Sequence, residues 1–205
     1  MAGVVSLVAF IPYVVSIVRD SKSPPSKLTW LILGGDTERT KPSRATWIIF
    51  SVTAVITLAS YSKAVDGNAI WVARGYVITT TLVALLSIKY GVWNPGRFDL
   101  WALVGCLATL ALWAISGSAE LALLAILATE GIGALSTIKK MLDRVNPEQE
   151  NGLAWILAYT ASVLTLLLVI VDEWSFLNAA YPAYLTVSSG VIAILSFQKK
   201  LVLPS

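Results

Sequence analysis

Seven apolar stretches follow one another along the chain and are separated by short polar segments. The hydrocarbon core of a bilayer is about 30 Å thick, and roughly 20 apolar residues in a helix cross it. Lipid offers no hydrogen bonds to a backbone, so helices are the structure that such stretches can adopt there. The predicted helices cover residues 2–18, 45–63, 68–90, 100–117, 119–142, 152–171 and 176–197. The sequence therefore predicts an all-α membrane protein with seven transmembrane helices.

Composition agrees with a membrane location. Hydrophobic residues make up 57% of the chain and charged residues only 13%, against about 45–50% and 25% in soluble domains. Many of the eight Trp residues lie near the ends of apolar stretches, which suits the aromatic belts at membrane interfaces. The net charge of +3 comes from basic residues that flank these stretches. We therefore attribute it to orientation in the bilayer and not to nucleic-acid binding.

The basic residues predict that orientation. With the N-terminus outside, thirteen of the fifteen Lys and Arg residues fall on the cytoplasmic side. Of the other two, Lys63 lies in an outside connection and Arg74 lies within a helix. Cytoplasmic connections carry an excess of Lys and Arg, and this bias requires an odd number of crossings. We therefore expect a multi-pass protein of the cell membrane with its N-terminus outside and its C-terminus in the cytoplasm.

The second half of the chain repeats features of the first. A shift of 108 residues aligns Trp47 with Trp155, and a shift of 109 aligns Thr79-Thr80 with Ser188-Ser189. Helix 2–18 pairs more weakly with helix 119–142. One linking helix between two sets of three leaves both sets in the same orientation, as in transporters built from parallel repeats. The alternative is chance similarity between apolar segments.

This plan divides the chain into three parts. Residues 1–93 form a first three-helix bundle, residues 94–118 a linker helix, and residues 119–205 a second three-helix bundle. The first bundle carries an extra cytoplasmic insert at about residues 24–40, in which residues 25–30 resemble residues 42–47. We expect Trp30 to hold this insert at the cytoplasmic interface. Alternatively, the first copy begins the second helix and the second copy is looped out.

The chain resembles the PQ-loop/SWEET superfamily in three features. These are the 3+1+3 plan, the Phe-Ile-Pro-Tyr segment at residues 10–13, and the helix entrances at Trp47 and Trp155. The resemblance covers essentially the whole chain and is to bacterial-type members without an assigned substrate. It implies passive or proton-coupled movement of a small polar solute by alternating access. It also implies that Pro12 is a hinge and that Trp47 and Trp155 form the cytoplasmic gate.

The chain departs from the superfamily pattern at three points. SWEET sugar transporters have prolines in the first two helices of both bundles, whereas only Pro12 is present here and Ser136 takes the corresponding place in helix 119–142. The Gln of the PQ dipeptide is replaced by Tyr13. Hydroxyl residues replace the asparagines expected in the third helix of each bundle. These departures point away from sugar as the solute.

Glu130 is the most informative single residue, because it lies near the middle of helix 119–142. A carboxyl group inside a membrane is energetically costly and marks a functional site by default. It would relay protons or bind a polar substrate. The alternative is a neutral, hydrogen-bonded acid that fixes helix packing. The small residues at 131–134 would let another helix approach closely under either hypothesis.

Other polar residues in the helices have two interpretations each. Thr79, Thr80, Ser188 and Ser189 would line a polar path, or their hydroxyls would bond their own backbone. Arg74 lies near the outer end of its helix, where it would extend to the lipid headgroups or pair with Glu130, Asp172 or Glu173.

The sequence contains no pattern for catalysis. It has no His and one Cys, and no nucleophile–base pair, phosphate-binding loop or metal cluster is visible. We therefore predict no enzyme activity, no catalytic residues, no metal and no cofactor. The expected partners are the lipid bilayer and an unidentified small polar solute, not nucleic acid; a homo-oligomer is compatible with the sequence. A transporter should have a polar central path with Glu130 facing it; the alternative is a non-transporting receptor or scaffold of the PQ-loop type.

Overall fold

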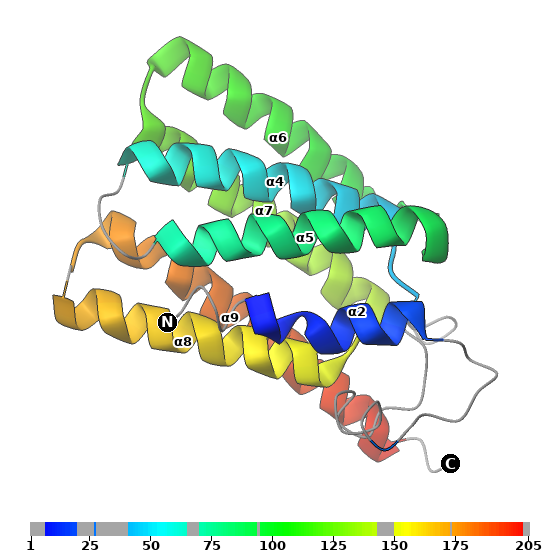
Figure 1. Cartoon of the computed structure of the whole chain (residues 1–205). Coiled ribbons are helices and arrows are strands. Elements are labelled where there is room, and N and C mark those ends of the chain that lie inside the picture. Colours follow the sequence, from blue (N-terminus) through cyan, green and yellow to red (C-terminus); the bar gives the residue numbers. More distant parts are fainter. Residues whose placement is uncertain are drawn as a thin grey trace.

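The computed structural model describes residues 7–19, 27, 41–64, 70–93, 95–142, 150–172 and 174–202. The described helices are α2 (Ile11–Val18), α4 (Arg44–Ala64), α5 (Ile70–Tyr90), α6 (Arg97–Ser116), α7 (Ala119–Leu142), α8 (Gly152–Asp172) and α9 (Phe176–Val202). They lie side by side, and helices that are consecutive along the chain from α4 to α9 run in opposite directions (Figure 1). The prediction of an all-α chain is confirmed for these residues.

Six of the described helices, α4 to α9, are long and apolar enough to cross a membrane. The first apolar helix, Leu7–Val18, is shorter than the others, and the residues before it lie outside the described part of the chain. The seventh crossing therefore stays a prediction. The insert at residues 24–40 also lies outside the described residues, apart from Lys27.

The start and end of α6 follow from two local signals. Gly96 precedes the helix, and its backbone N–H donates to the Asp99 carboxylate at 2.7 Å. This capping contact explains why α6 begins at Arg97, earlier than the predicted residue 100. Gly117 ends the helix with a φ of 67°, a left-handed conformation that glycine adopts without steric cost. The tight connection to α7 is therefore where the sequence predicts it.

The predicted plan groups six of the described helices into two sets of three, which we call the first and the second triplet. In the first triplet (α2, α4 and α5), α5 contacts both other members; in the second triplet (α7, α8 and α9), α9 does so. Between the triplets, α4 packs against α7 and α2 packs against α8. Helix α6 packs against α7 and α4 and lies at one edge of the bundle (Figure 1).

The contact between α4 and α7 depends on Gly133. A Cβ atom added at Gly133 would lie 2.8 Å from a ring carbon of Phe50 on α4. Such a distance is well inside van der Waals contact, so only glycine permits this approach of the two helices. The close approach that the sequence predicts at residues 131–134 is confirmed there. Gly131 does not share this role, since a Cβ atom at that position would meet nothing within 4 Å.

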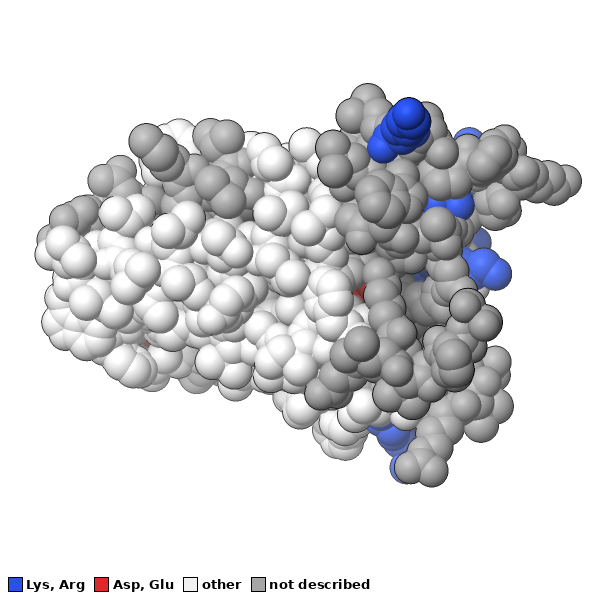
Figure 2. Space-filling view, turned by 90° about the horizontal axis from the view of Figure 1, so that it is seen from below, with Lys and Arg blue, Asp and Glu red and all other residues white. Residues whose placement is uncertain are grey.

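Basic side chains gather at one end of the molecule, which we call the basic end (Figure 2). Arg44 begins α4, Lys89 lies in the last turn of α5, Arg97 begins α6, and Lys140 lies in the last turn of α7. The long middle part of the molecule is almost free of charge on the face shown in Figure 2. The described residues thus show the charge separation predicted from the sequence. Which side of the membrane holds the basic end stays a prediction.

Candidate functional site

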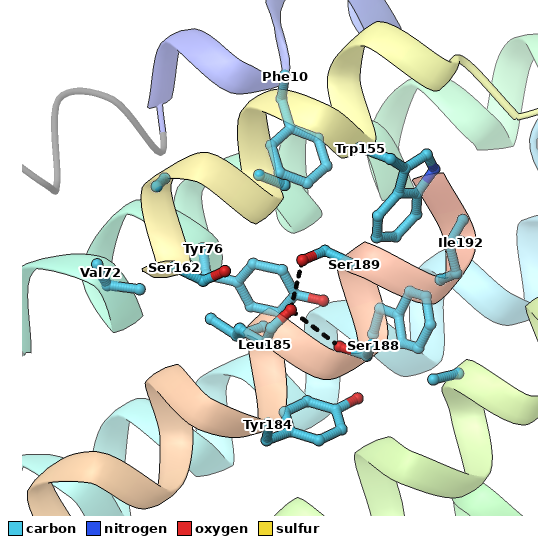
Figure 3. Close-up of a pocket in the computed structure, with 14 residues that line it drawn as sticks. Phe10, Val72, Tyr76, Trp155, Ser162, Tyr184, Leu185, Ser188, Ser189 and Ile192 are labelled. Carbon is cyan, nitrogen blue, oxygen red and sulfur yellow. Dashed lines mark hydrogen bonds between the residues drawn. The ribbon is translucent and has the colours of Figure 1, made fainter. Parts of the chain in front are cut away.

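A small cavity lies between the two triplets (Figure 3). Its volume is about 30 Å³, and one water molecule needs about 10–15 Å³. The cavity in this conformation is therefore narrow, and a solute larger than water would need the triplets to move apart. The lining residues are Phe10, Phe50, Val72, Tyr76, Ala134, Trp155, Ala158, Ala161, Ser162, Tyr184, Leu185, Ser188, Ser189 and Ile192.

The lining is mostly aromatic and aliphatic, and none of its residues is charged. Its serine hydroxyls all donate to backbone carbonyls of their own helices. Ser162 donates to the carbonyl of Tyr159 at 2.8 Å, while Ser188 and Ser189 both donate to the carbonyl of Leu185, as the dashed lines in Figure 3 show for the last two. The Ser162 and Ser189 hydroxyls therefore present oxygen lone pairs to the cavity, whereas Ser188, whose bond to the carbonyl is 3.4 Å long, also hydrogen-bonds the side chain of Tyr184.

Several lining residues correspond between the two triplets. At the shifts found in the sequence, and with Pro12 aligned to Ser136, the pairs are Phe50 with Ala158, Tyr76 with Leu185, and Phe10 with Ala134. In each pair the first triplet provides an aromatic ring and the second a smaller aliphatic side chain. The second triplet also contributes two aromatic rings, those of Trp155 and Tyr184.

Aromatic side chains are packed on the side of the cavity toward the basic end. Trp47 is buried among rings from α2 and α4, with its ring centroid 5.0 Å from that of Tyr13 and 5.7 Å from that of Phe50. Its indole N–H donates to the Tyr13 hydroxyl at 3.1 Å. Trp155 lines the cavity itself and donates to Glu150 at 3.0 Å. Pro12 is buried in the first turn of α2, where its missing N–H removes no helical hydrogen bond.

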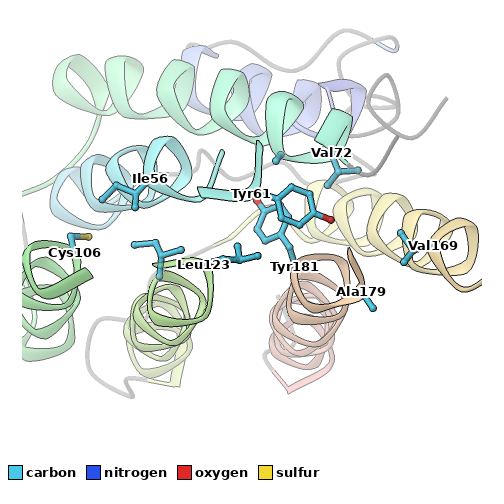
Figure 4. Packing of buried hydrophobic residues seen from close by; sticks show 10 residues of the cluster. Ile56, Tyr61, Val72, Cys106, Leu123, Val169, Ala179 and Tyr181 are labelled. Atoms are coloured by element: carbon cyan, nitrogen blue, oxygen red, sulfur yellow. The ribbon is translucent and has the colours of Figure 1, made fainter. Parts of the chain in front are cut away.

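Tyrosines are packed on the other side of the cavity. The ring centroid of Tyr181 lies 5.8 Å from that of Tyr61 and 6.3 Å from that of Tyr76. Tyr61 and Tyr181 belong to a buried cluster that also contains Val72 and Val169 (Figure 4). The sequence shifts relate Tyr61 to Val169 and Val72 to Tyr181. Corresponding residues of both triplets therefore meet in this cluster.

Glu130 lies in the contact between α7 and α4 and is only 1% exposed. Thr57 on α4 donates to its Oε1 atom at 3.0 Å, and its Oε2 atom is buried without a hydrogen-bond partner. Glu130 is not among the cavity-lining residues, although Ala134, one turn further along α7, is. The geometry therefore gives no support to Glu130 as a lining residue of this cavity. A role in proton transfer stays a prediction.

The four hydroxyl residues differ in position. Thr79 and Thr80 are buried, donate to carbonyls of their own helix at Gly75, Tyr76 and Val77, and do not line the cavity. Ser188 and Ser189 do line it. The structure thus places only the second-triplet pair at the cavity.

Arg74 is exposed and stacks on Trp71, with its guanidinium carbon 4.5 Å from the ring centroid. This contact agrees with the predicted position at a lipid interface. Among the described side chains no ion pair joins Arg74 to Glu130. The alternative partners Asp172 and Glu173 have side chains outside the described part of the structure.

A second polar site at the basic end was missed in the sequence analysis. Lys140 on α7 forms an ion pair with Asp99 on α6, with its Nζ atom 2.9 Å from Oδ2. The same ammonium group donates to Ser43 at 3.0 Å and to Thr46 at 2.6 Å. Ser136 donates to the other carboxylate oxygen of Asp99 at 2.8 Å. This buried network joins the start of α4, the start of α6 and the end of α7.

The two triplets also begin their second helices alike. Ser43 accepts from the backbone N–H of Thr46 at 3.4 Å, and Asn151 accepts from that of Ala154 at 3.0 Å. The same shift of 108 residues relates Ser43 to Asn151. Each of these capping residues lies four positions before a Trp, at Trp47 and Trp155. This spacing is a sequence signal by which the repeat could have been followed back to the start of each helix.

Among the described residues, no group of three His, Cys, Asp or Glu side chains is placed to hold a metal ion. Comparison with protein-family models, with curated proteins and with solved structures finds no match to this chain. The resemblance to the PQ-loop/SWEET superfamily therefore rests on the sequence pattern alone.

Proposed function

We propose that this protein is a SWEET-like transporter, which moves a small solute across a membrane by alternating access between its two triplets. The observation that carries the proposal is the cavity between the triplets, with clusters of buried aromatic residues toward both ends of the molecule. Such an arrangement is what an occluded state of an alternating-access transporter requires, with the solute site at the repeat interface.

The helix contacts support two parallel repeats. In the repeat, α2 corresponds to α7 and α4 corresponds to α8. The contact between α4 and α7 should therefore have a counterpart between α8 and α2, and both contacts are present. A pseudo-twofold axis along the membrane normal relates one contact to the other. The pairs of corresponding residues around the cavity fit the same axis. Movement of one triplet against the other would then open the two ends in turn.

In this mechanism Glu130 acts at the interface between the two triplets and not inside the cavity. Its hydrogen bond to Thr57 joins α7 of the second triplet to α4 of the first. Movement between the triplets would strain or break this bond and expose the carboxyl group to a change of environment. Proton coupling, if present, would act through that change.

A labelling experiment tests alternating access without knowledge of the solute. Ser189 is replaced by Cys in a Cys106→Ser background, and right-side-out and inside-out vesicles are treated with a small membrane-impermeant thiol reagent. We expect the Ser189→Cys variant to be labelled from both sides, since Ser189 lines the cavity. The matched control is Thr80→Cys, at the corresponding position of α5, which is buried away from the cavity and should stay unlabelled.

Labelling from one side only, or from neither, would contradict alternating access and favour the non-transporting receptor or scaffold. Solute uptake into proteoliposomes, compared between the wild-type protein and Glu130→Gln, then tests transport directly. Equal flux of every candidate solute into protein-containing and empty liposomes would exclude the solutes screened.

A further inference from the structure

We propose that the cavity between the triplets takes a neutral solute with an apolar body and one or two hydrogen-bond donors, and not a sugar, an amino acid or an ion. The inference rests on the proposed function for the movement between the triplets that widens the cavity enough to admit the solute. It concerns equilibrium binding of the solute to the widened cavity. It narrows the solute class from the small polar solute expected from the sequence.

Charge is the first argument. None of the fourteen lining residues is ionisable near neutral pH, because the two tyrosines are the only titratable groups among them. A charged solute in an apolar cavity loses its hydration without gaining a counter-ion, which is strongly unfavourable. The Glu130 carboxyl group on α7 is not part of the lining, and its Oε1 atom accepts a hydrogen bond from Thr57 on α4. The lining therefore selects against both anions and cations.

Hydrogen-bond direction is the second argument. The hydroxyls of Ser162, Ser188 and Ser189 donate hydrogen bonds to backbone carbonyls. The indole N–H of Trp155 donates to the Glu150 carboxylate. What these serines offer to a solute is a set of acceptors on α8 and α9. A hydroxyl or amide N–H of a solute would match them.

The number of polar groups is the third argument. A sugar carries a hydroxyl on nearly every carbon, and each would need a partner once it is buried. The lining provides three serines and two tyrosines among aromatic and aliphatic side chains, with Phe10, Phe50 and Trp155 as the largest apolar surfaces. Most hydroxyls of a bound sugar would therefore stay unsatisfied, whereas an apolar body would pack against the rings.

The test uses four probes that differ in charge and polarity: benzyl alcohol, benzylammonium, benzoate and glucose. Each is radiolabelled and dialysed to equilibrium against the purified full-length protein in detergent, and the bound probe is counted. Ala158 lines the cavity, so Ala158→Leu places a larger side chain in the cavity space. The matched control is Ala108→Leu on the exposed face of α6, which changes the same residue type away from the cavity. Probe that partitions into the detergent micelle is the same for both variants, so subtracting the bound probe of one variant from that of the other removes this contribution.

We expect the wild-type protein and Ala108→Leu to bind benzyl alcohol, and Ala158→Leu to bind it roughly tenfold more weakly because the added side chain overlaps the solute. Benzylammonium, benzoate and glucose should show no difference between the variants. If Ala158→Leu does not fold, Ser189→Ala serves instead. It removes one acceptor while keeping the helix, and should weaken benzyl alcohol binding several-fold, roughly as loss of one hydrogen bond does.

Equal or tighter binding of a charged probe or of glucose would overturn the proposal, as would benzyl alcohol binding that no cavity variant changes. Benzylammonium binding that is lost in Glu130→Gln would assign the site to a cation. The outcome is separable from that of the transport proposal. Benzyl alcohol binding without two-sided labelling of the Ser189→Cys variant would leave the solute class standing and remove alternating access.

Discussion

The hydroxyl of Tyr61 donates a hydrogen bond of 2.8 Å to the backbone carbonyl of Asn178. Asn178 precedes Pro182 by four residues in α9, and a proline has no N–H to offer to the carbonyl one turn before it. Tyr61 on α4 therefore supplies the donor that α9 lacks. This contact joins the first triplet to the second at the end of the molecule opposite the basic end.

Tyr61→Phe removes the donor and keeps the ring. We expect a loss of about 1–2 kcal/mol in the free energy of unfolding, because a carbonyl in a poorly hydrated position loses its partner. We also expect faster labelling of the Ser189→Cys variant from the side of the Tyr61 cluster, measured in oriented vesicles. The control is Tyr159→Phe on α8, at a residue that is 41% exposed. Unchanged labelling in Tyr61→Phe would mean that the contact does not close the cavity.

The ion pair between Asp99 and Lys140 gives a prediction on stability. Lys140→Met leaves the Asp99 carboxylate, which is 2% exposed, without its counter-ion. Removing one partner of a buried pair typically costs about 3–5 kcal/mol, and we expect a value toward the lower end because Ser136 and Gly96 still donate to the carboxylate.

The double variant Asp99→Asn with Lys140→Met removes both charges and should recover much of the loss in unfolding free energy. Lys139→Met is the control, since Lys139 is exposed, and it should change stability by less than about 0.5 kcal/mol. Chemical unfolding in detergent measures all three. A double variant as unstable as Lys140→Met would show that the carboxylate does not need the ammonium group.

The number and limits of the long helices could be predicted from the sequence, because a bilayer imposes length and apolarity on each segment. The turn at Gly117 and the close packing at Gly133 were accessible for a similar reason: each depends on a local property of one glycine. The orientation of the Glu130 side chain could not be predicted from the sequence. A residue in mid-membrane has several faces available, and only the packing of α4 against α7 directs this carboxyl group to Thr57.

The cavity shows the same limit. The sequence pointed to Ser188 and Ser189, which line it, and equally to Thr79 and Thr80, which do not. Repeat-related residues are equivalent in sequence, but the packing of the folded chain decides which of them reaches the cavity. The Asp99–Lys140 pair was missed because its members lie 41 residues apart and each resembles an ordinary charge at a helix end.

Glu130 allows the proton hypothesis to be separated from a packing role. Glu130→Gln keeps an oxygen that can accept from Thr57, so we expect the free energy of unfolding to change by less than about 1 kcal/mol. Glu130→Leu leaves the Thr57 hydroxyl without this acceptor and should cost about 1–3 kcal/mol.

If Glu130 carries a proton during transport, Glu130→Gln should abolish the pH dependence of solute flux in proteoliposomes while the Ser189→Cys variant is still labelled from both sides. Flux with the same pH dependence in both proteins would restrict Glu130 to packing.

Gly133 and Gly131 form a matched pair on α7. Gly133→Ala places a Cβ atom 2.8 Å from the Phe50 ring, and Phe50 cannot move away freely because it packs against Trp47. We expect a loss of about 1–3 kcal/mol in the free energy of unfolding from overpacking. Gly131→Ala meets nothing within 4 Å and should stabilise the helix by up to about 1 kcal/mol, since alanine is the better helix former. Unfolding of the two variants in parallel measures the difference, and equal stabilities would show that α4 and α7 are not held in contact at Phe50.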